Sequence, residues 1–148
     1  IADRPTNGNT DILGRQTDCS NYGYYSDTGQ SYAKNVLTSY GNTYGVGDII
    51  GVALDLDSST KTIQFSVNGT DTPNSTPVDL PSTFDNVFIF PYFIGNSSSA
   101  TSNWELNFGS PPYSISSGNS DANGYGNFEY SVPSGYYSIN TKNLAEFG

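Results

Sequence analysis

Two stretches in which apolar and polar residues alternate strictly constrain the fold of this chain more than any other feature. The apolar positions of the first stretch are Ile50, Val52, Leu54 and Leu56, and those of the second are Ile63, Phe65 and Val67. Alternation with a period of two places one set of side chains on a single face of a β-sheet. Residues 50–67 therefore predict two strands joined by a polar turn.

The composition extends this prediction to the whole chain. Gly, Pro, Ser, Thr and Asn, which favour turns, make up about half of the residues, whereas 12 Tyr and 8 Phe supply apolar area that disordered chains lack. Further strands are expected over residues 22–25, 30–33, 87–94 and 104–108, with a last strand-like piece that ends near Ile139. No segment has a helical period of useful length. Many short strands separated by turns predict an all-β fold, an antiparallel β-sandwich.

The charge and the cysteine content exclude several classes of function. The chain has 14 acidic and 5 basic residues, and its cations are scattered, whereas a surface that binds nucleic acid or an anionic membrane gathers them. No histidine is present to activate Cys19, the single cysteine, or to complete a zinc site. We therefore expect no metal, no cofactor, and neither nucleic acid nor membrane as a partner.

Asp55 and Asp57 raise the question of catalysis. On one face of a strand they would lie about 6.5–7 Å apart, a separation at which carboxylate pairs hydrolyse glycosides. Such a pair also needs one carboxyl group whose pKa is raised by its surroundings, and two acids on the wet face of a strand lack that difference. Two carboxylates alone also fill too few of the oxygen positions around calcium. We expect both aspartates to belong to the scaffold, and we expect no catalytic residue.

Several stretches, taken in their order along the chain, carry a resemblance to a known family. They are YGYYSDTG, YGNTYGVGDIIGVALDLDSSTKTIQFSVNGT, FPYFIGN and WELNFGSPPY. This order resembles the SPRY domain over roughly residues 20–113. The resemblance implies two packed antiparallel sheets related to the concanavalin-like lectin sandwiches. It also implies that the LDLD motif is part of the scaffold.

The two ends of the chain carry further resemblance. Ile1-Ala2-Asp3 looks like the end of a strand that earlier strands precede in SPRY domains, and DANGYGNFEYSVPSGYYSINTKNLAEFG resembles the tail of SPRY-containing proteins of tailed bacteriophages. We expect residues 1–148 to form a single SPRY-like domain without its first strands, with residues 114–148 as a C-terminal extension. The phage resemblance implies a location in the virion and a longer polypeptide or assembly, and an ordinary cellular protein of this kind would be cytoplasmic.

Three functions are compatible with these observations. The first is a non-enzymatic interaction module of a phage virion structural protein, associated with capsid or tail, that binds another virion protein or a host surface. The second is a lectin-like domain that binds carbohydrate, and the third is an intracellular adaptor that binds a short peptide. The fold alone does not separate them.

The tyrosines in the first third of the chain are the best candidates for a binding surface, because Tyr offers contact area at low entropic cost. In peptide-binding SPRY domains the contacts lie on loops at one end of the sandwich. The positions nearest to those contacts are Tyr25, Tyr32, Phe93, Ile94 and Gly95. We expect Tyr32 to be an exposed anchor. Trp104 is expected in the core or at its edge, and Phe108, like Phe65, on an inner apolar face.

Overall fold

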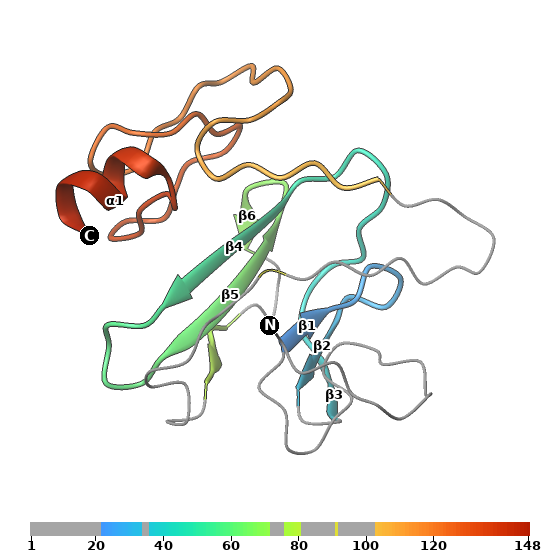
Figure 1. Ribbon diagram of the computed structural model, residues 1–148. Coiled ribbons are helices and arrows are strands. Elements are labelled where there is room, and N and C mark those ends of the chain that lie inside the picture. The colour runs from blue at the N-terminus through green and yellow to red at the C-terminus, as the bar shows by residue number, and fades with distance from the viewer. Residues whose placement is uncertain (1–21, 34–35, 72–75, 81–90, 92–102) are drawn as a thin grey trace, which may run out of the picture.

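The computed structural model describes residues 22–33, 36–71, 76–80, 91 and 103–148, which form two antiparallel sheets and one helix (Figure 1). Sheet A has the order β1-β2-β3, and sheet B contains β4 and β5 with two short strands, β6 and β7, that both pair with β5. The bounds of the strands are β1 Tyr22–Tyr24, β2 Gln30–Ala33, β3 Val36–Ser39, β4 Ile50–Asp55, β5 Thr62–Val67, β6 Thr70–Asp71 and β7 Val78–Asp79. The predicted all-β fold with antiparallel sheets is confirmed.

The register of β4 and β5 follows the alternation in the sequence. Val52 lies opposite Phe65, with Ile50 opposite Val67 and Leu54 opposite Ile63. Directly opposed residues of an antiparallel pair project from the same face, so these six side chains share one face of sheet B. Phe65 and Val67 are buried on it, whereas Val52 is exposed.

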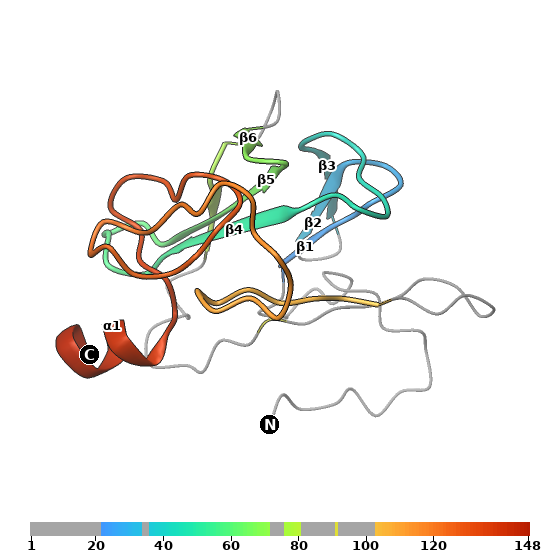
Figure 2. The ribbon, with the colours of Figure 1, turned by 90° about the horizontal axis from the view of Figure 1, so that it is seen from above.

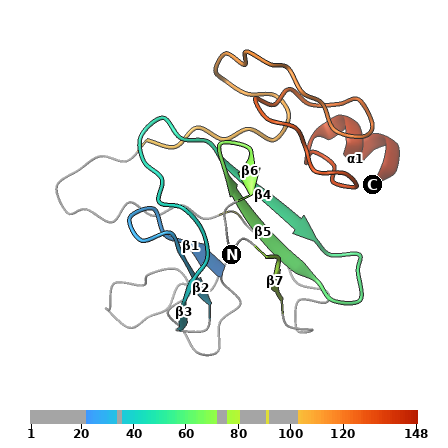
Figure 3. The ribbon, with the colours of Figure 1, turned by 180° about the vertical axis from the view of Figure 1, so that it is seen from behind.

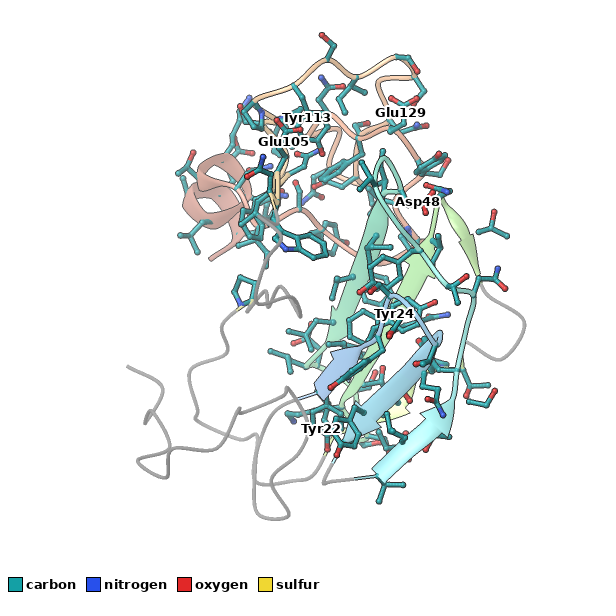
Figure 4. All side chains as sticks on the ribbon, turned by 90° about the vertical axis from the view of Figure 1, so that its right-hand side faces the viewer. Tyr22, Tyr24, Asp48, Glu105, Tyr113 and Glu129 are labelled. Atoms are coloured by element: carbon teal, nitrogen blue, oxygen red, sulfur yellow. The ribbon has the colours of Figure 1, made fainter. Side chains whose placement is uncertain are left out.

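Aromatic side chains join the two sheets. The ring of Tyr24, on β1, lies 5.5 Å from the ring of Phe65 and 5.4 Å from the ring of Tyr40, between centroids. Figure 4 shows Tyr24 between the two sheets. Aromatic pairs at this spacing stabilise a core beyond the area that they bury. The rings of Tyr24, Tyr40 and Phe65 therefore make up much of the core that the described residues form.

Tyr40 also completes the hydrogen bonding of β5. Along one side of β5, β7 pairs with Thr62 and Ile63, and β6 pairs with Ser66 and Val67. Figure 3 shows β6 and β7 at the two ends of β5. Between them the backbone N–H of Phe65 donates to the hydroxyl oxygen of Tyr40 at 2.8 Å, in a buried setting. A side chain thus takes the place that a neighbouring strand would occupy.

The C-terminal segment, which we define as residues 111–148, contains the helix α1 (Thr141–Phe147). Asn140 begins this helix, because its side chain accepts hydrogen bonds from the backbone N–H groups of Lys142 and Asn143. The sequence shows no helical period here, because α1 spans only seven residues. The strand-like piece expected to end near Ile139 is absent, so that prediction is wrong. Among the described residues, no helix is long and apolar enough to cross a membrane.

A buried carboxylate organises the C-terminal segment. Asp121 is only 6% exposed. One of its oxygens accepts from the N–H and the hydroxyl of Ser138 and from the side chain of Asn143, and the other accepts from the N–H groups of Asn123 and Tyr125. Burial alone would raise the pKa of Asp121, but these hydrogen bonds hold it well below its ordinary value. The interior of this segment is thus polar and fully hydrogen-bonded around one charge.

Candidate functional site

Three connections meet at one end of the sandwich, which we call the loop end: residues 26–29, 41–49 and 68–69. Gln30 lies opposite Ser39, and Ile50 lies opposite Val67, so these connections leave the two sheets at the same end. The N–H of Gly41 donates to the carbonyl of Gly29 at 2.7 Å. Backbone hydrogen bonds therefore hold the long connection 41–49 against the first turn.

Tyr44 fixes the middle of the long connection. Its N–H donates to the carbonyl of Ser26 at 2.9 Å, and its hydroxyl donates to the carbonyl of Tyr24 at 2.8 Å. Burial, together with the nearby Tyr24 and Asp27, raises the pKa of Tyr44 to about 12. The hydroxyl is therefore a proton donor throughout the neutral range. Tyr24 in turn donates its own hydroxyl to the carbonyl of Asn42.

Asn68 joins the long connection to the β5–β6 turn. Its Oδ1 accepts the N–H of Ile49 at 2.9 Å, and its Nδ2 donates to Asp48 at 2.7 Å. This bond from Asn68 and a second from the N–H of Gly45 lower the pKa of Asp48. Asn68 and Gly69 have φ angles of 52° and 71°, as two-residue hairpin turns require. The Asn-Gly pair therefore forms the β5–β6 turn, and Asn68 also holds this turn to the long connection.

The outer surface of the loop end is exposed, polar and acidic. Its exposed side chains include Asp27, Asn42, Thr43, Val46, Asp48 and Asn68. Val46 is fully exposed, between two glycines. No Lys or Arg lies in the three connections, and the described part of the chain contains no group of side chains that could hold a metal ion. This surface offers hydrogen bonds and one apolar tip, which suits binding.

Two of the five predicted site residues lie in the described structure. Tyr25 is half-buried at the end of β1, and its ring meets the ring of Tyr32 edge-on at 5.8 Å. Tyr32 is only 7% exposed, so the prediction of an exposed anchor is wrong. On β2 it alternates with Ser31, which lies opposite Tyr24, so Tyr32 projects from the other face of sheet A. Phe93, Ile94 and Gly95 lie outside the described residues.

Asp55 and Asp57 do not form a pair on a strand face, because β4 ends at Asp55. Asp55 accepts hydrogen bonds from the N–H of Asp57 and from the N–H and hydroxyl of Ser58, at 2.6–3.0 Å. These bonds, first those of Ser58, lower the pKa of Asp55, whereas a glycosidase acid needs a raised one. Asp55 therefore stabilises the turn after β4, as an aspartate at the start of a turn commonly does.

The predicted strand over residues 104–108 is also absent from the described structure. Residues 103–107 are not in a strand, and Trp104 and Phe108 are 44% and 43% exposed. Phe108 is therefore not on a closed inner face, contrary to prediction, and Trp104 is at most at the edge of the core. Nothing local in the sequence relates Asn68 to Asp48, whereas an Asn-Gly pair is a common signal for a hairpin turn.

Comparison with known families agrees with this geometry. Residues 3–110 match the model of the SPRY domain. The chain belongs to the SPRY family. The match starts at Asp3, well before the stretches over residues 20–113 that resemble the SPRY domain, and ends just after the Asn107-Phe108-Gly109 motif. No solved structure matches the SPRY domain of this chain. SPRY domains are generally protein-interaction modules rather than enzymes, which is consistent with the exposed, polar loop end.

Proposed function

We propose that this SPRY protein is a non-enzymatic interaction module that binds a protein partner through its loop end. One observation carries the proposal: connections from both sheets are tied together by hydrogen bonds, while their outer side chains stay exposed. A surface that is already ordered loses little conformational entropy on binding. The loop end is such a surface, because hydrogen bonds already order its connections before a partner binds.

The chemistry of the loop end favours a protein over a sugar. Val46 offers an apolar tip, and the side chains around it, such as Asn42 and Thr43, donate and accept hydrogen bonds. Tyr24, Tyr40 and Tyr44 pack against one another instead of presenting flat rings on which a sugar could stack. Carbohydrate binding is the alternative that the lectin-like sandwich suggests.

We propose further that the partner is a virion subunit or a host surface, and that the protein belongs to a bacteriophage particle, as a capsid- or tail-associated structural protein. The support for this step is the resemblance of residues 121–148 to the tails of SPRY-containing phage proteins. The acidic chain, with a net charge of −9, is consistent with a protein rather than a nucleic-acid partner inside such a particle.

Site-specific photo-crosslinking in assembled particles tests both steps. A photoreactive p-benzoylphenylalanine replaces Val46 in one sample and Ser59 in the other. Ser59 is also exposed but lies in the β4–β5 turn, away from the loop end. We expect a crosslink from position 46 to one defined virion protein, identified by mass spectrometry, and none from position 59. Equal crosslinking from both positions, or from neither, would overturn the proposal.

A glycan array tests the alternative function, carbohydrate binding. The protein is expected to leave the array unlabelled. Specific binding to one glycan that the substitution Val46→Asp abolishes would instead support the lectin-like function.

A further inference from the structure

The C-terminal segment lies wholly beyond the family match, which ends at residue 110, and yet it is well organised. Asp121 joins the loop that follows it to Ser138 and Asn143. Asn123 donates to Asn143 at 2.9 Å, and Tyr125 donates its hydroxyl to Glu146 at 2.7 Å, so α1 is held to the same loop. A segment with this many internal bonds behaves as one structural unit.

The first attachment of this unit is the Asn107-Phe108-Gly109 motif. The Oδ1 of Asn107 accepts the N–H of Gly109, and its Nδ2 donates to the carbonyl of Asn127, each at 2.8 Å. Gly109 has a φ of 110°, and a Cβ there would lie 3.0 Å from the side-chain nitrogen of Asn140 and 3.3 Å from Gly126. Asn107 and Gly109, near the end of the SPRY match, therefore pack closely against residues of the C-terminal segment.

The second attachment lies at the loop end. A Cβ at Gly69 would clash with the ring of Tyr130, so the tyrosine side chain lies directly against one side of the β5–β6 turn. Figures 1 and 2 both place the C-terminal segment on the side of sheet B and away from sheet A. In Figure 4, Glu129 and Asp48 lie at the same end of the molecule. The segment thus reaches the loop end at the β5–β6 turn.

We propose that the C-terminal segment is a built-in cap that occupies the β5–β6 turn side of the loop end and restricts a partner to the remainder, residues 26–28 and 42–47. Asp121 keeps the cap folded, and Tyr130 seats it on Gly69. This inference rests on the proposed role of the loop end as a binding surface. It adds that a partner contacts the β1–β2 turn and Val46, because Tyr130 already covers the β5–β6 turn.

NMR of the isolated full chain tests the seating of the cap without any partner. An aromatic ring in contact with Gly69 shifts the Hα resonance on the covered side through its ring current. Tyr130→Ala should abolish this shift, whereas Tyr137→Ala, which removes an exposed tyrosine from the same segment, should leave it unchanged. Asp121→Asn should also abolish it by loosening the cap, and Asp57→Asn, the same change at an exposed turn, should not.

Each outcome bears on the inference. An unshifted Gly69 Hα in the unmodified protein, or a shift that survives Tyr130→Ala, overturns the seating of the cap. A shift that survives Asp121→Asn overturns the role of Asp121. If Asp121→Asn unfolds the sheets as well, the pair Tyr130→Ala and Tyr137→Ala still decides. Failure here leaves the crosslinking from position 46 unaffected, and failure of that crosslinking leaves the Gly69 shift unaffected.

Discussion

Tyr40→Phe removes a single oxygen from the core. The ring stays, with its contacts to Tyr24 and Phe65 at 5.4 and 6.0 Å between centroids. The acceptor of the Phe65 N–H is lost, and neither β6 nor β7 pairs with β5 at that position. Tyr40 is only 3% exposed, so water does not readily replace the hydroxyl. The variant therefore leaves a buried backbone donor without its acceptor.

The expected loss of stability follows from that donor. A buried donor left without an acceptor costs about 1–3 kcal/mol. With a urea m-value of about 1–3 kcal/mol/M, the midpoint of unfolding should fall by roughly 1 M. The m-value itself should stay constant, because the variant buries the same apolar surface.

Urea unfolding followed by tyrosine and tryptophan fluorescence measures the midpoint, and amide hydrogen exchange measures the protection of the Phe65 N–H. Tyr137→Phe is the matched control, because Tyr137 is 55% exposed and its hydroxyl should matter little. An unchanged midpoint together with an unchanged exchange rate at Phe65 would refute the reasoning.

Three further predictions concern other parts of the chain. Phe65→Ala should cost about 3–5 kcal/mol of unfolding free energy because Phe65 is buried, whereas Phe108→Ala should cost clearly less, and equal urea midpoints would contradict the assignment. Asp55→Ala should lower the Tm in calorimetry more than Asp57→Ala, because Asp55 accepts the hydrogen bonds of the turn; the reverse order would show that the turn does not depend on them. The folded pKa of Asp121 is below its ordinary value, so its stabilising effect is complete above the unfolded pKa and declines as the pH falls below about 4. The protection of amides in residues 119–128, taken relative to their intrinsic exchange rates at each pH, should decrease over that range in the unmodified protein. An Asp121→Asn variant with the same pH dependence of protection would contradict this origin.

The sequence predicted those parts of the fold that depend on local alternation and turn chemistry. The faces of β4 and β5 follow from period two, and Asn68-Gly69 marks the hairpin turn at the end of β5. Strand β3 was missed because its four residues show no alternation between apolar and polar residues. Helix α1 was missed because seven residues are too few for a helical period, and its apolar residues Leu144 and Phe147 are exposed.

The candidate site was harder to predict, because its contacts join residues far apart in the sequence. Tyr32 alternates correctly along β2, but alternation does not tell which face of a sheet is covered. Asp48 and Asn68 are 20 positions apart and meet only because β4 and β5 pair in one register. The role of Asp121 depends in the same way on Ser138 and Asn143, so no local motif predicts it.

The hydroxyl of Tyr40 between β6 and β7 has a consequence for the behaviour of the protein in concentrated solution. An uninterrupted strand edge offers a row of backbone donors and acceptors to which another molecule can add a strand, and this is a common route to aggregation. In the described part of sheet B, the side of β5 away from β4 is divided into two pairings of two residues each, and the donor of Phe65 between them is already bonded. A second molecule therefore finds no long ladder to extend along this side. The hydroxyl of Tyr40 thus blocks edge-to-edge pairing at this side of β5 as well as belonging to the core.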